Sequence, residues 1–177
     1  CVNSCFFCYY IHKGIKNETK SIPLVVRHMK QLMEQHNTNK FHLVDAEVNF
    51  DDTYLREVSH ALHPTGALWS ALCIPHMKAK MIKTAAYGGC REFRWGIESG
   101  SPKMLDILGK GTTLQSIKRS LIAAKYLGIH NYATFLTHLP QETPTDRYET
   151  QLFIKSIAGY LDSVQECTYG DYGHCST

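Results

Sequence analysis

The sequence lacks several features that would assign it to a common class of protein. It has no run of five residues of like charge, and its net charge is only +3, so nothing indicates a nucleic-acid groove or a polybasic membrane anchor. No apolar stretch approaches the roughly 18 to 20 residues that span a bilayer, and nothing resembles a secretory signal peptide. We therefore expect a cytoplasmic protein that acts on a small substrate or a protein partner.

The cysteines do not form a pattern typical of disulfides. There are seven, an odd number, and three of them are crowded at the start of the chain. The remaining four are scattered, as Cys73, Cys90, Cys167 and Cys175. This is a poor disulfide framework, so we expect reduced thiols. At 177 residues, 44% of them hydrophobic, we expect 1–177 to be one domain, and the absence of an initial methionine suggests a fragment of a longer protein.

The three crowded thiols are the most informative feature of the sequence. Cys1, Cys5 and Cys8 fall at i, i+4 and i+7, and they converge only if the backbone loops round a common point. Four thiolates usually complete a closed structural zinc site, whereas three leave one position for an exogenous ligand. From the spacing alone, a zinc loop completed by His12 or Cys175 remains an alternative.

Apolar periodicity and turn residues predict strands that alternate with helices. We expect strands over 41–47, 67–74, 92–98, 129–137 and 161–169, and helices that begin at 21, 51, 75, 101, 113 and 143. Within the third strand, alternation places Arg94, Gly96 and Glu98 on one face. A structural ion pair between Arg94 and Glu98 therefore competes with any catalytic role for them.

This order predicts an α/β fold with a parallel sheet and right-handed crossovers. The chain is shorter than the ~250 residues of a closed eightfold barrel, so we expect a partial barrel. Because a helix precedes the first visible strand, we also expect that a strand before Cys1 is missing. The cysteine loop and the segments 45–49, 98–101 and 138–142 would then meet at the rim formed by the carboxyl ends of the strands.

The spacing Cys-x3-Cys-x2-Cys, with Phe7 directly before the last cysteine, resembles the cluster-binding signature of radical S-adenosylmethionine (radical SAM) enzymes. The resemblance implies a (β/α)6-type, TIM-like barrel in which Cys1, Cys5 and Cys8 hold three irons of a [4Fe-4S] cluster. S-adenosylmethionine would chelate the fourth iron beside Phe7. An external one-electron reductant such as flavodoxin or ferredoxin would start its cleavage to a 5′-deoxyadenosyl radical, so that the cofactors carry the difficult chemistry.

Two further segments resemble radical SAM motifs. Residues 44–49, Val-Asp-Ala-Glu-Val-Asn, look like the segment after the second barrel strand, which implies that Glu47 meets the methionine amino group; a solvated acidic loop or helix cap is the alternative. Residues 96–101, followed by Lys-Gly-Thr-Thr at 110–113, resemble the cobalamin-associated and methylthiotransferase-like subgroups. This resemblance implies that Glu98 or Ser99 binds the ribose hydroxyls, and that cobalamin binds through a domain absent from this chain.

Residues 138–143, His-Leu-Pro-Gln-Glu-Thr, resemble the Gly-Leu-Pro-Gly-Glu-Thr stretch that follows the fifth strand. His138 and Gln141 replace both glycines, so side chains stand where the family keeps room for a ligand. His138 is a candidate for substrate binding or proton transfer, and a hydrogen-bonded structural histidine is the alternative.

The resulting hypothesis is a radical SAM core domain that initiates methylation, methylthiolation or rearrangement of an unknown substrate. Two alternatives remain: a zinc-loop binding module, and a degenerate barrel that binds S-adenosylmethionine or a partner without catalysis. Because the strand that should anchor the cysteine loop is expected to be missing, we also expect the isolated chain to hold its cluster poorly.

Overall fold

A computed structural model describes residues 5, 7–8, 19–44 and 47–170, which contain one parallel sheet. The strands are hydrogen-bonded in chain order, and every neighbouring pair is parallel. Within the described residues the sheet does not close, because β1 and β5 are its two edges. The predicted α/β fold with a partial parallel barrel is confirmed. The strands are β1 (Lys40–Leu43), β2 (Leu68–Cys73), β3 (Cys90–Glu98), β4 (His130–Thr137) and β5 (Ser163–Thr168).

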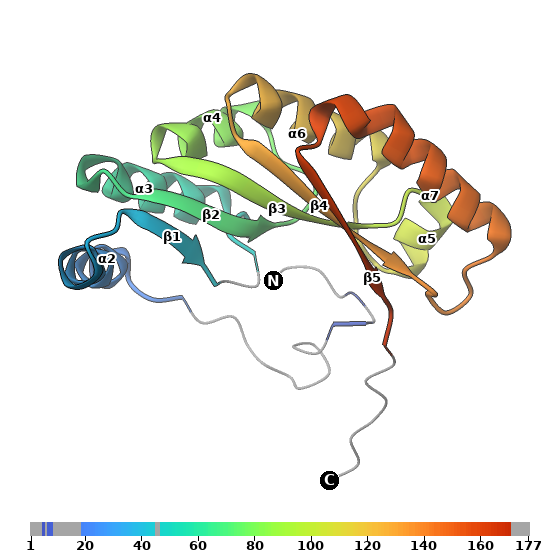
Figure 1. The fold of residues 1–177 in the computed structure, drawn as a ribbon, viewed down its shortest axis with the longest axis horizontal. Coiled ribbons are helices and arrows are strands. Elements are labelled where there is room, and N and C mark those ends of the chain that lie inside the picture. The colour runs from blue at the N-terminus through green and yellow to red at the C-terminus, as the bar shows by residue number, and fades with distance from the viewer. Residues whose placement is uncertain (1–4, 6, 9–18, 45–46, 171–177) are drawn as a thin grey trace, which may run out of the picture.

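Helices connect successive strands, because parallel neighbours need a crossover connection. Figure 1 shows α3, α4, α6 and α7 on one side of the sheet, and we call the opposite side the open face. Among the described residues, no helix has the length and apolar character needed to span a bilayer. The helices are α2 (Ile22–His36), α3 (Asp52–Leu62), α4 (Ala79–Tyr87), α5 (Pro102–Ile107), α6 (Leu114–Tyr126) and α7 (Pro144–Ile157), with short 3₁₀ turns at His63–Thr65 and Ala158–Tyr160.

Side-chain caps fix the starts of three helices where the sequence predicts them. The Asp51 carboxylate accepts a hydrogen bond from the backbone N–H of Tyr54 at the start of α3. Thr113 begins α6 and Thr143 begins α7, each in a reciprocal capping box with the residue three positions later. These bonds satisfy backbone N–H groups that have no partner inside the helix.

The predicted start of α4 at Pro75 is wrong, because the helix begins at Ala79. The amide of Asn49 explains the delay. Its Nδ2 donates to the carbonyls of Ile74 at 3.1 Å and His76 at 3.3 Å, and its Oδ1 accepts from the Ile74 N–H at 2.8 Å. These bonds tie the segment after β2 to the segment after β1, so it cannot enter a helix.

Strand β1 is shorter than predicted, since it ends at Leu43 rather than at residue 47. The chain nevertheless returns to β2, because the backbone N–H of Val48 donates to the carbonyl of Leu72 at 2.9 Å. Glu47 is therefore positioned at the carboxyl edge of the sheet although it lies outside the strand.

The main core lies between the sheet and its helices. Phe93, Trp95 and Ile97 of β3 are fully buried on the helix side, as the predicted alternation requires. The indole N–H of Trp95 donates to Oδ1 of Asn131 at 2.8 Å, and the Asn131 amide donates to two backbone carbonyls, those of Leu121 and Tyr160. This buried polar group is thus satisfied, and it connects β3, β4 and α6.

A second, smaller apolar cluster lies apart from the main core. Met104, Leu108 and Leu139 are its buried members, so it joins α5 to the segment that follows β4. The partly buried residues packed against it include Phe7 and Tyr169. We call this group the rim cluster, because it fastens the cysteine loop to the edge where the strands end.

Candidate functional site

The cysteine loop makes a tight turn against the rim. The backbone N–H of Cys8 donates to the carbonyl of Cys5 at 3.0 Å, and the Sγ of Cys5 lies 3.8 Å from the carbonyl oxygen of Gly109. Cys5 is 6% exposed and Cys8 is half-buried. Within the part of the chain that the structure describes, no three His, Cys, Asp or Glu side chains form a metal site. Cys1 lies outside the described residues, so the three-thiolate set stays a prediction.

Phe7 anchors this turn. Its ring packs against the rim cluster, and the Nζ of Lys110 lies 5.8 Å from the ring centroid, within the range of a cation–π contact. An aromatic residue between two cysteines thus provides apolar surface that holds the loop against the edge of the sheet. The predicted contact of Phe7 with a cofactor remains a prediction.

Beside Phe7, Lys110 also makes a buried ion pair with Glu98. The Nζ–Oε1 distance is 3.3 Å, and the two side chains are only 8% and 12% exposed. Glu98 has a left-handed φ of +70°, at a point where the register between β3 and β4 shifts. A Cβ on Gly96 would lie 2.7 Å from Oε1 of Glu98, so any other residue here would force the Glu98 carboxylate to move.

The ion pair between Arg94 and Glu98, the structural alternative to a catalytic role for them, does not form. The Nε of Arg94 instead donates to Oε1 of Glu92 at 2.8 Å. Side chains four residues apart on a strand are separated by roughly 13 Å, whereas those two residues apart are separated by roughly 6.6 Å. The carboxylate of Glu92 is therefore within reach of Arg94, and that of Glu98 is left to Lys110.

The charges at the rim act on the thiol of Cys5. Burial raises the pKa of Cys5, the positive charge of Lys110 opposes this shift, and Cys8, Glu98 and Glu47 add to it. Burial also raises the pKa of the Glu98 carboxyl, against the attraction and hydrogen bond of Lys110. Burial thus favours the protonated thiol of Cys5, and a metal that binds it must displace a proton.

Glu47 lies close to this group, as the sequence predicts. It is 4% exposed, and its charge raises the pKa of both Cys5 and Cys73. Sequence reasoning missed its neighbour His76, which follows β2 at the same edge. Burial lowers the pKa of His76 while Glu47 opposes the shift, and its buried Nδ1 has no hydrogen-bond partner among the described residues. Nothing in the local sequence around His76 signals this position.

Ser99 and Gly100 pack against α7. The hydroxyl of Ser99 lies 3.1 Å from that of Thr150 and accepts from the backbone N–H of Ser101, and Ser99 has no exposed surface. A Cβ on Gly100 would lie 2.6 Å from the Cβ of Phe153. The Gly/Ser composition of this turn is explained by close helix packing, and the predicted ribose contact of Ser99 stays a prediction.

The segment after β4 keeps a left-handed backbone at both replaced glycines. His138 has φ +61° and Gln141 has φ +66°, a region that L-residues rarely adopt. The Glu142 carboxylate holds this turn, since it accepts from the backbone N–H of His138 at 3.1 Å and from Nε of Arg147 at 3.3 Å. The His138 ring is exposed and lies 3.1 Å from the hydroxyl of Thr137; its catalytic role is untested.

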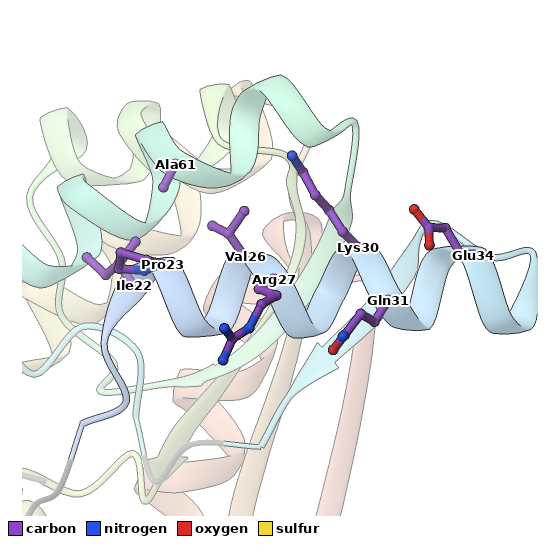
Figure 2. A pocket seen from close by; sticks show the side chains of 8 residues that line it. All are labelled: Ile22, Pro23, Val26, Arg27, Lys30, Gln31, Glu34 and Ala61. Carbon is purple, nitrogen blue, oxygen red and sulfur yellow. The ribbon is translucent and has the colours of Figure 1, made fainter.

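A surface groove of about 520 Å³ lies elsewhere, between α2 and α3. Figure 2 shows that its lining includes Val26, Arg27 and Lys30 of α2 and Ala61 of α3. None of the predicted site residues lines it. The rim is therefore the candidate site, and the groove is not part of it.

Comparisons with known proteins agree with this architecture. A curated relative, an uncharacterized methyltransferase from Pyrococcus horikoshii, is 26% identical over 161 residues, which cover 89% of this chain and 35% of the relative. Among solved structures, TsrM from Kitasatospora setae, a radical S-adenosylmethionine methyltransferase with cobalamin and a [4Fe-4S] cluster bound, matches with a TM-score of 0.80 and 19% identity. That match covers 95% of this chain and 32% of TsrM.

The cobalamin-dependent S-adenosylmethionine radical enzyme OxsB, with aqua-cobalamin and S-adenosylmethionine bound, matches with a TM-score of 0.75 and 19% identity, over 87% of this chain and 25% of OxsB. This chain spans about a third or less of the length of these three proteins. The structural likenesses show the fold. The model of the radical SAM superfamily matches residues 1–154, and this protein therefore belongs to the radical SAM superfamily.

Proposed function

We propose that this chain is the catalytic core of a radical enzyme, which binds a [4Fe-4S] cluster through Cys1, Cys5 and Cys8 and binds S-adenosylmethionine beside it. The proposal rests on one observation above the rest: the Cys5–Cys8 turn is fastened to the carboxyl edge of a parallel sheet, where Glu47 and the Glu98–Lys110 pair also lie. When bound, the reduced cluster supplies the electron that cleaves S-adenosylmethionine to a 5′-deoxyadenosyl radical.

The residues present fit such a cluster. Cysteine thiolates are the usual ligands of iron–sulfur clusters, and the two described thiols lie on one turn. Lys110 is a buried cation whose charge opposes the rise in the pKa of Cys5 caused by burial, so it favours the thiolate form that a metal needs. Phe7 and the rim cluster cover one side of the loop with apolar surface, which limits the access of water.

The carboxylates would hold the two polar ends of S-adenosylmethionine. Glu47 is suited to accept hydrogen bonds from the methionine ammonium, because a buried carboxylate is stabilised by a cation. Of the two candidates for the ribose, Glu98 is the better placed. Its Oε1 binds Lys110 while its Oε2 has no partner among the described residues, whereas the hydroxyl of Ser99 is already bonded to Thr150.

We propose methyl transfer as the reaction, since the Pyrococcus horikoshii relative and TsrM are both described as methyltransferases. Cobalamin is the second cofactor that we propose, since TsrM and OxsB were both solved with cobalamin bound. It would bind outside residues 1–177. An external one-electron donor such as flavodoxin or ferredoxin would reduce the cluster.

Anaerobic reconstitution tests the cluster. The wild-type chain should take up iron and sulfide, the triple variant Cys1→Ala, Cys5→Ala, Cys8→Ala should not, and Cys167→Ala should behave as wild type because Cys167 lies on β5, outside the cysteine loop. Equal iron in the triple variant, or stoichiometric zinc without iron, would exclude the cluster.

A second assay tests the chemistry. Dithionite reduction of the reconstituted chain with S-adenosylmethionine should release 5′-deoxyadenosine. A chain that holds the cluster and binds S-adenosylmethionine, yet releases none, would be a non-catalytic barrel.

A further inference from the structure

The open face of the sheet carries a connected group of polar side chains that the proposed cofactor site does not use. Parallel register aligns Arg94 of β3 with Tyr132 of β4, and Glu92 with His130 one row nearer the amino ends of the strands. Because side chains on a strand alternate between faces, these residues lie opposite the buried Phe93 and Trp95.

Arg94 is held in place from two sides. Its Nε donates to Oε1 of Glu92 at 2.8 Å, and its guanidinium carbon lies 5.2 Å from the centroid of the Tyr132 ring. The other oxygen of Glu92 lies 3.4 Å from Nδ1 of His130. The hydroxyl of Tyr132 in turn donates to Oε1 of Gln165 on β5. The guanidinium is thus oriented by Glu92 of its own strand and by Tyr132 of β4, and Gln165 of β5 holds Tyr132.

The two terminal nitrogens of Arg94 are the part of this guanidinium that could bind a ligand. Glu92 occupies Nε, and among the described residues nothing accepts a hydrogen bond from the two terminal nitrogens of Arg94. The side chain is 41% exposed. A planar guanidinium with two adjacent free N–H groups matches the two oxygens of a carboxylate or phosphate, and a fixed orientation reduces the entropy lost on binding.

We propose that Arg94 forms a binding site for an oxyanion, the carboxylate or phosphate group of the substrate, on the open face of the sheet. This inference rests on the proposed function and extends it to a class of substrate. Arg94 lies two residues before Gly96, or roughly 6.6 Å further from the rim. A substrate anchored there extends toward Glu98, so its reacting part lies at the cofactor and its acidic group lies deeper.

Calorimetric titration of the cluster-free chain with succinate, and separately with inorganic phosphate, tests the site at fixed ionic strength. At least one anion should bind to the wild-type chain. Arg94→Gln should raise the dissociation constant of that anion by about tenfold or more, as expected for a lost charged hydrogen bond. Arg94→Lys should also bind weakly, because it keeps the charge but loses the planar fork. Arg56→Gln, the same charge change on the exposed side of α3, should bind as wild type.

The outcomes distinguish a carboxylate from a phosphate ligand and test whether the site exists. Succinate binding without phosphate identifies a carboxylate, and the reverse identifies a phosphate. Binding of neither anion to the wild-type chain, or equal binding to a folded Arg94→Gln or Arg94→Lys variant, would overturn the site. Since no cluster is needed, failure of reconstitution with intact anion binding would refute only the proposed radical chemistry.

Discussion

The buried ion pair between Glu98 and Lys110 gives the most quantitative prediction, through replacement of one or both partners. Lys110→Met and Glu98→Gln change each side chain to a neutral one of similar size. Opposite charges 3.3 Å apart attract by about 5 kcal/mol at an effective dielectric constant of about 20. Removing both from water costs several kcal/mol for each ion, so the net contribution of the pair is small.

The single variants should therefore be far worse than the double variant. Each one leaves an uncompensated charge in a site that is about nine-tenths buried, and we expect a loss of about 3 kcal/mol or more in the free energy of unfolding. The double variant leaves neither of these two charges without its partner and should be nearly neutral. Urea unfolding of the cluster-free chain, followed by circular dichroism, gives the three free energies.

An exposed pair provides the matched control. Lys78 and Asp52 are 3.0 Å apart, but their side chains are 80% and 53% exposed, so Lys78→Met should cost less than about 1 kcal/mol. If the Glu98–Lys110 double variant lost as much as the two single variants together, the two side chains would not interact, and our account of the rim would be wrong.

Three further predictions concern backbone strain, close packing and charge. Replacing His138 or Gln141 by glycine should stabilise the chain by about 0.5–1 kcal/mol each, because both have positive φ; unchanged or lower melting temperatures would contradict this. Gly100→Ala should cost about 1–3 kcal/mol, whereas Gly159→Ala, whose added Cβ meets nothing within 4 Å, should melt close to wild type. Hydrogen bonds from Lys103 and Thr143 hold the pKa of Asp146 well below its usual range. The stabilisation that Asp146 provides should therefore be present above about pH 4, the pKa of an unfolded Asp, and be lost as the pH falls below it. Melting temperatures measured across pH should show less acid dependence in Asp146→Asn than in wild type, and an unchanged dependence would exclude Asp146 as its source.

Much of the fold was predictable because its signals are local. Thr113 and Thr143 cap the helices that they were expected to start, and strand alternation assigned Phe93 and Trp95 to the core. The start of α4 was not predictable, because Pro75 is a normal first-turn residue. What excludes it from the helix is the amide of Asn49, which binds the backbone on either side of it from 25 residues earlier.

The sequence predicted where the candidate site lies in the fold but not which side chains contact one another there. Glu47 follows β1 and Glu98 ends β3, so topology alone brings both to the rim. The partner of Glu98 was missed because Lys110 lies 12 residues later in the sequence, beyond the strand whose alternation was used to pair side chains. The alternative that paired Arg94 with Glu98 failed because strand alternation gives the face on which a side chain lies but not the distance it can reach.

The left-handed turn at His138 and Gln141 has a consequence for engineering this edge of the sheet. Since Glu142 fixes the path of the backbone from within the loop, the identity of residues 138 and 141 is not what shapes it. Both side chains are exposed. A library that varies these two positions would therefore exchange chemical groups beside the rim on a constant scaffold, at a cost of about 1 kcal/mol or less for most residues relative to glycine. Under the proposed function, these two positions are where substrate selection could be altered without reshaping the loop.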